Sequence, residues 1–102
     1  MTLKEMFLNA IITNKIGENI KGSIFVETSE FKNYFKQIIF SNYVGTFLPA
    51  ATIEKGRGEA THTKYLFRVK RGVYRVHYGA IKEQIEKNIQ EECDEFYLKQ
   101  IK

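Results

Sequence analysis

The sequence predicts an α+β fold in which three helices and a β-hairpin precede one long amphipathic helix. Three observations predict this class. Apolar residues recur every three or four positions in several separate segments, which is the period of an amphipathic helix. Two runs rich in aromatic and β-branched residues flank Lys70-Arg71-Gly72, which indicates a hairpin. The chain has 102 residues, 43% of them hydrophobic, which suits one domain with a single core.

The first element is predicted to be a helix from Thr2 to about Ile16. Thr2 and Glu5 have the spacing of a capping box, and Gly17 is placed to end the helix. Its apolar face consists of Leu3, Met6, Phe7, Ala10 and Ile11. A short strand is predicted next, because apolar residues and glycine alternate with polar ones at Ile20, Gly22, Ile24 and Val26.

Two further helices are predicted before the hairpin. Thr28 or Ser29 is the expected N-cap of the second helix. Its apolar face is Phe31, Tyr34, Phe35, Ile38 and Ile39. Residues 41–45 break the pattern, and Pro49 suits the first turn of a short third helix that runs to Lys55 before Gly56.

The hairpin is predicted to follow a loop at 56–63 that has no large apolar residue. Its strands are residues 65–69 and 73–77, with Gly72 at the position that requires a positive φ. Strand alternation gives the hairpin an apolar face and a basic face. The apolar face is Phe67, Val69, Tyr74 and Val76, and the basic face carries Arg68 and Arg75.

Residues 79–102 are predicted to form the long C-terminal helix. Its apolar positions are Ile81, Ile85, Ile89, Cys93 and Phe96. We expect residues 1–78 to form the domain, and the last helix either to pack on it or to pair with a second copy of the chain.

Positive charge is concentrated in one part of the chain. Residues 1–78 hold 12 Lys and Arg against 6 acids, whereas residues 79–102 hold 4 against 6. Between residues 55 and 78 the only acid is Glu59, and the cations are Lys55, Arg57, Lys64, Arg68, Lys70, Arg71 and Arg75. This segment favours a polyanionic partner, although a solvated hairpin edge has the same composition.

The predicted order of elements is that of a winged helix-turn-helix domain. In that architecture the third helix enters the major groove and the hairpin, or wing, lies against the DNA backbone or the minor groove. The candidate nucleic-acid-binding residues are Thr52, Lys55, Arg57, His62, Lys64, Arg68, Lys70, Arg71 and Arg75. Tyr65 and Tyr78, at the ends of the hairpin, are candidates for exposed stacking on bases.

Two stretches of sequence resemble winged-helix domains associated with bacterial restriction endonucleases and related defence proteins. One is Tyr65-Leu66-Phe67-Arg68-Val69-Lys70-Arg71-Gly72-Val73-Tyr74-Arg75-Val76, and the other is Phe47-Leu48-Pro49-Ala50-Ala51-Thr52-Ile53. The similarity covers roughly residues 28–78, and Lys70 stands where that family commonly has glycine. The resemblance implies a DNA-binding regulator or recognition module, with any catalysis supplied by another chain or domain.

No catalytic or metal site is expected. Asp94 is the single aspartate, so a two-carboxylate nuclease site would need glutamates alone. His62 and His77 have no metal-ligand spacing, and Cys93 falls on an apolar helix face as a structural thiol would. We therefore expect no cofactor and no enzymatic activity.

The expected partner is double-stranded DNA, and the alternative is a host protein. A small winged helix of phage or plasmid type also serves as an adaptor or inhibitor, because fold does not fix function. The chain has one cysteine, no signal-peptide pattern and no apolar stretch of about 20 residues, so a cytoplasmic protein without a membrane span is expected.

Overall fold

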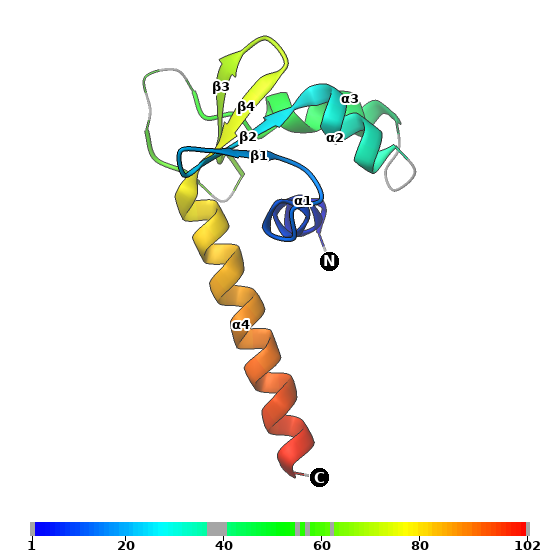
Figure 1. The fold of residues 1–102 in the computed structure, drawn as a ribbon, viewed down its shortest axis with the longest axis vertical. Helices are drawn as coiled ribbons and strands as arrows, with labels where there is room; N and C mark the ends of the chain where they lie inside the picture. The colour runs from blue at the N-terminus through cyan, green and yellow to red at the C-terminus, as the bar shows by residue number, and fades with distance from the viewer. Residues whose placement is uncertain (1, 37–40, 55, 57, 62, 102) are drawn as a thin grey trace.

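The computed structural model of the chain describes residues 2–36, 41–54, 56, 58–61 and 63–101, with side chains described outside 41–44 and 93–101. Across these ranges the chain forms four helices and a four-stranded antiparallel sheet of order β1-β2-β4-β3, which confirms the α+β class (Figure 1). The elements are α1 Leu3–Ile12, β1 Glu18–Ile20, β2 Ser23–Glu27, α2 Thr28–Phe35, α3 Ser41–Ala50, β3 Leu66–Lys70, β4 Val73–Val76 and α4 Tyr78–Ile101.

Helix α1 begins as predicted and ends earlier. The Thr2 side chain accepts a hydrogen bond from the Glu5 amide at 3.2 Å, as a capping-box threonine does. The predicted end at Ile16 is wrong, because Asn14 has φ of 60° and turns the chain out of the helix. The Lys15 amide donates to the Ala10 carbonyl at 2.8 Å, and this reversed turn closes the helix.

The segment predicted as one short strand is a hairpin of two. Lys21 and Gly22 both have positive φ, 53° and 86°, as a two-residue type I′ turn requires. The side-chain oxygen of Asn19 accepts a hydrogen bond from the Gly22 amide at 3.1 Å, which stabilises the turn. Strand β1 is exposed along its length, and β2 runs between β1 and β4.

Helix α2 is capped by the backbone. The predicted N-cap, Thr28 or Ser29, is wrong: Glu27 is the N-cap, and its side chain accepts no capping hydrogen bond. Instead, the Thr28 amide donates to the Gly72 carbonyl in the β3-β4 turn at 2.8 Å. Phe31 is buried as predicted, as is Phe35, whereas Tyr34 is 39% exposed and is not a core residue. Positions 38 and 39 lie outside the described residues.

The predicted third helix is misplaced by about two turns. Helix α3 is Ser41–Ala50, so Pro49 lies in its last turn and not its first. Pro49 itself has no amide to donate, the Ala51 and Thr52 amides still bond back to the Phe47 and Pro49 carbonyls, and the chain then leaves the helix to run beside β3. Thr52 forms a parallel bridge with Leu66, and the Ile53 amide donates to the Leu66 carbonyl at 2.7 Å.

The strands of the β3-β4 hairpin lie within one residue of the predicted bounds, and its faces are displaced by one residue. The pairs are Leu66 with Val76, Phe67 with Arg75, Arg68 with Tyr74 and Lys70 with Val73. An irregularity between Arg68 and Lys70 shifts the register, so the ladder is one residue out from the regular one. The buried face is consequently Leu66, Tyr74 and Val76, while Val69 is half exposed. The predicted apolar face was wrong for this reason.

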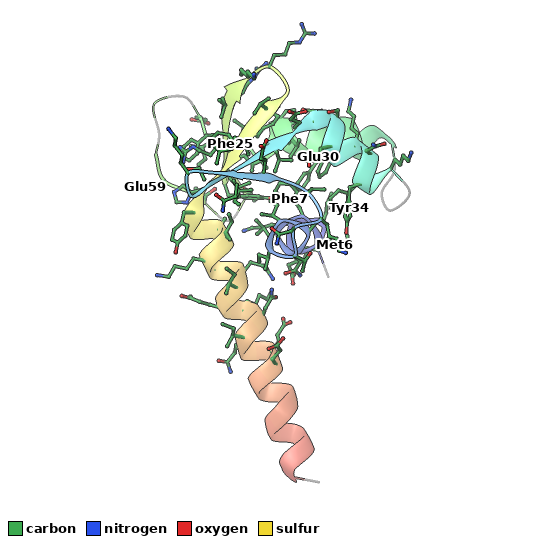
Figure 2. The ribbon with its side chains drawn as sticks, viewed as in Figure 1. Met6, Phe7, Phe25, Glu30, Tyr34 and Glu59 are labelled. Atoms are coloured by element: carbon green, nitrogen blue, oxygen red, sulfur yellow. The ribbon has the colours of Figure 1, made fainter. Side chains whose placement is uncertain are left out.

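The core is a cluster of aromatic rings on one face of the sheet. Phe7 of α1 is fully buried (Figure 2). The centroid of its ring lies 5.7 Å from that of Phe31 and 5.5 Å from that of Phe47. Helices α1, α2 and α3 therefore meet at one side chain. Helix α4 packs on α1 with its first half and then extends away from the body, so the molecule measures 52 × 31 × 24 Å (Figure 1).

Candidate nucleic-acid interface

The structure places six of the nine predicted contact residues. Lys55, Arg57 and His62 lie outside the described residues. Those that it places are Thr52, Lys64, Arg68, Lys70, Arg71 and Arg75. They divide into three groups, at the end of α3, on the hairpin tip and on the outer face of the sheet.

Thr52 and Lys64 direct their polar groups to the end of α3. The Thr52 hydroxyl donates to the Leu48 carbonyl at 2.8 Å, and the Lys64 ammonium lies 3.5 Å from the Ala50 carbonyl. A cation at a helix C-terminus is favourable because the last carbonyls carry partial negative charge. The prediction that Thr52 lies on the third helix is wrong, because that helix ends at Ala50.

Three exposed cations lie on the tip of the β3-β4 hairpin, which we call the wing (residues 66–76). Arg68, Lys70 and Arg71 are all exposed, and Gly72 closes the turn with φ of 77°. Arg68 pairs with the buried Tyr74, and directly paired residues point to the same face of a sheet. Arg68 therefore lies on the face that α2 and α3 cover, beyond the core.

Arg75 lies on the opposite face from Arg68, so the predicted single basic face is wrong. Its guanidinium carbon is 4.4 Å from the centre of the Phe67 ring, and the His77 ring stacks on Phe67 at 5.7 Å. Phe25 of β2 is the other cross-strand neighbour of Arg75. Arg75 is half-buried in this row and is engaged by an aromatic ring.

The outer face of the sheet also carries acids. A hollow of about 460 Å³ there is lined by Lys70 and by three carboxylates, those of Glu18, Glu27 and Glu30. Carboxylates repel a phosphate backbone, so this face suits a polyanion less than the Arg68 side does. The wing thus separates a mixed-charge surface from a side that presents Arg68, with Arg71 at the turn between them.

Helix α3 offers no formal charge. The segment from Ser41 to Ala50 contains no Lys, Arg, Asp or Glu, and Thr46 is exposed on it. A groove-entering helix of this kind has no cation with which to contact phosphate or guanine. Charge for a nucleic-acid contact must therefore come from outside α3.

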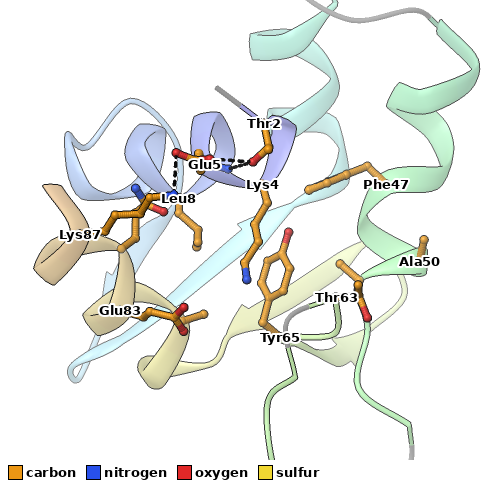
Figure 3. A pocket seen from close by; sticks show the side chains of 13 residues that line it. Thr2, Lys4, Glu5, Leu8, Phe47, Ala50, Thr63, Tyr65, Glu83 and Lys87 are labelled. Atoms are coloured by element: carbon orange, nitrogen blue, oxygen red, sulfur yellow. Dashed lines mark hydrogen bonds and ion pairs between the residues drawn. The ribbon is translucent and has the colours of Figure 1, made fainter. Parts of the chain in front are cut away.

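A pocket of about 390 Å³ lies where α1, the end of α3 and α4 meet (Figure 3). The Lys4 ammonium lies 4.9 Å from the centre of the Tyr65 ring, and Lys87 forms an ion pair with Glu5 at 3.3 Å. The hydrogen bond from Lys87 lowers the pKa of Glu5. Tyr65 is only 2% exposed, so its predicted role as an exposed stacking platform is wrong. Tyr78 is 71% exposed.

We expect Tyr65 to make the fold sensitive to alkali. Burial raises the pKa of its phenol above the ordinary value, so the folded chain holds the neutral form. Stability from this group is complete below the unfolded pKa of about 10 and falls as the pH rises above it. Unfolding by urea between pH 8 and pH 11 measures this loss.

In the Tyr65→Phe variant the additional alkaline loss should disappear. Tyr78→Phe removes an exposed phenol and should leave the additional alkaline loss of stability unchanged. Equal pH dependence in the wild type and in Tyr65→Phe would contradict the assignment.

The described residues contain no group of three or more His, Cys, Asp or Glu side chains placed to hold a metal ion. Nδ1 of His77 accepts a hydrogen bond from the Gly79 amide at 2.9 Å. Within the described part of the chain no helix is long and apolar enough to cross a membrane.

Comparison of the chain with protein-family models, with curated proteins and with solved structures gives no match.

Proposed function

We propose that this protein is a non-catalytic winged helix-turn-helix module that binds duplex DNA through the wing. The order of elements supports this architecture, because α2 and α3 lie between β2 and β3 in the chain. Strand β4 pairs with both β2 and β3, so the hairpin extends the sheet beside the helix pair. The first strand β1 and the long α4 are additions to that arrangement.

One observation carries the proposal. The wing tip, with Arg71 exposed, is bonded to the start of α2 through the Gly72 carbonyl and the Thr28 amide at 2.8 Å. Arg68 lies on the same side of the sheet as that helix pair. Two guanidinium groups with freedom to reach a phosphate backbone thus flank the helices, and arginine is suited to bidentate phosphate contacts.

The uncharged α3 shapes the expected mode of binding. Phosphate contacts fix the register of a protein on DNA and carry no sequence information. With cations on the wing and none on α3, affinity comes mainly from phosphates and sequence discrimination is small. The resemblance of residues 65–76 to wings of restriction-associated domains supports a role in a defence or mobile-element system.

A protein partner is the second candidate, and the composition of α3 favours it. A helix whose sequence contains no charge suits a protein interface core, where charged residues are depleted. In that case the cations of the wing would meet an acidic surface of a host protein.

The test is a fluorescence-anisotropy titration of labelled duplex and single-stranded DNA at about 50 and about 200 mM salt. We expect salt-sensitive binding that prefers the duplex. In the variant Arg68→Ala/Arg71→Ala the slope of log affinity against log salt should fall by about two, since each phosphate contact contributes about 0.9. The loss should be similar on unrelated sequences.

Lys15→Ala/Lys21→Ala is the matched control, because it also removes two exposed cations. Lys21 lies in the turn at the far end of β2 from the wing, so this variant should keep the slope. If the wild type does not bind duplex at low salt, the DNA proposal fails and the protein partner takes its place. If both double variants lower the slope equally, the wing has no special role.

A further inference from the structure

Helix α4 contacts the body through the apolar side chains of Ala80 and Ile81 and, farther along, through polar groups. Gln84 is buried, and its amide donates to the Asn88 side chain at 3.0 Å. Asn88 in turn donates to Asn9 of α1 at 2.8 Å, and Lys87 pairs with Glu5. The contact of α4 with α1 therefore includes a row of amides and one ion pair, and the exposed Ile85 and Ile89 lie elsewhere on the helix.

A line of apolar side chains runs along another side of α4. Tyr78, Ile85 and Ile89 are 71%, 40% and 54% exposed. At 3.6 residues a turn, Ile85 and Ile89 lie within about 20° of the line through Tyr78 along the helix. In the sequence Phe96 stands five full turns after Tyr78. Burial of this line in a helix pair is favourable, and nothing within the described chain covers it.

We infer that this line pairs with its own copy in an antiparallel homodimer centred on position 87. Positions 78, 85, 89 and 96 are arranged symmetrically about position 87. A two-fold axis at position 87 therefore brings Ile85 opposite the partner's Ile89. The same axis places Lys82 in one layer with the partner's Glu92. An isologous contact requires such a self-complementary surface.

Charge selects the antiparallel arrangement. Lys82 and Glu92 are exposed and lie about 40° to either side of the apolar line. In an antiparallel pair each lysine shares a layer with a carboxylate of the partner subunit. In a parallel, in-register pair lysine would meet lysine and glutamate would meet glutamate, which is unfavourable. This arrangement is independent of whether the wing binds DNA.

The first test is sedimentation equilibrium of the full chain over a range of concentrations. A reductant is included so that Cys93 forms no disulfide. We expect a reversible monomer-dimer equilibrium, and the variant Ile85→Ser/Ile89→Ser should raise the dissociation constant by about 100-fold or more. Both positions are exposed in the monomer, so circular dichroism at low concentration should show an unchanged fold.

Charge exchange tests the register. Lys82→Glu alone, or Glu92→Lys alone, should weaken the dimer by about fivefold to tenfold, because each puts like charges in two layers. Combining them should restore wild-type affinity. Glu91→Lys, on the opposite side of the helix, is the control and should have no effect. A wild type that stays monomeric, or a dimer that survives both serines, would overturn the inference. Failure of the exchange to restore affinity would overturn the antiparallel register.

Discussion

Replacing Phe7 with alanine is expected to lower the free energy of unfolding by about 3–5 kcal/mol. The ring is 0% exposed and lies at the centre of the aromatic core, against Phe31 and Phe47. Its loss leaves a cavity that α1, α2 and α3 share, so none of the three can close it alone. Equilibrium urea unfolding followed by circular dichroism measures the change.

Small domains have about 5–15 kcal/mol of stability, so the alanine variant can lose most of it. Phe7→Leu keeps part of the volume and should give a smaller loss in the same direction. Tyr34→Ala, at an exposed aromatic position on α2, is the matched control and should cost about 1 kcal/mol or less. Similar losses for Phe7→Ala and Tyr34→Ala would contradict the placement of the core.

Replacing Gly17 with alanine is expected to cost about 2 kcal/mol or more. Gly17 has φ of +90°, a conformation that disfavours any side chain by about 1–2 kcal/mol. A Cβ there would lie 3.0 Å from Cγ2 of Ile24, so the Ile24 side chain would also have to move by a few tenths of an ångström. The site joins α1 to the sheet, and the strain therefore acts on both.

Gly22→Ala separates the two contributions. Gly22 has a similar φ of +86°, but an added Cβ would meet no atom within 4 Å. This variant should show the conformational cost alone, and Gly17→Ala should show that cost plus the steric one. Thermal unfolding of both gives the comparison, and a Gly22→Ala variant at least as destabilised as Gly17→Ala would contradict the close contact with Ile24.

Several elements could be predicted because their determinants are local. The Thr2–Glu5 capping box needs only residues within one turn, and it forms as expected. The wing was predictable because glycine at position 72 supplies the positive φ that the turn requires. Burial of Phe31 and Phe35 followed from helical spacing within α2.

The predictions fail where the chain departs from regular alternation or from the usual conformational preference of a residue type, and where a distant segment determines the end of a helix. The register shift between Arg68 and Lys70 puts Leu66 and Arg68, and not Phe67 and Val69, on the same face as Tyr74 and Val76. An alternating sequence pattern does not reveal such a shift. The turn at Lys21 could not be predicted, because lysine rarely adopts the left-handed conformation that it has there. Pro49 fits either end of a short helix by composition, and its place in the last turn depends on how the following segment pairs with Leu66.

The same shift decides how much of the candidate site the sequence could predict. The concentration of cations in the wing is a property of composition, and the structure shows Arg68, Lys70 and Arg71 exposed there. Their division between two faces is a property of strand register. Regular alternation predicts Arg75 on the same face as Arg68, whereas its pairing with Phe67 puts it on the other face.

The hydrogen bond from the Thr28 amide to the Gly72 carbonyl has a thermodynamic consequence for any ligand of the wing. It ties the turn to the first residue of α2, so the turn is already ordered before a partner arrives. Freezing a loose loop on association costs configurational entropy, and this loop has lost much of that freedom on folding. Binding at the wing should therefore be preorganised, with its selectivity determined by shape as much as by charge.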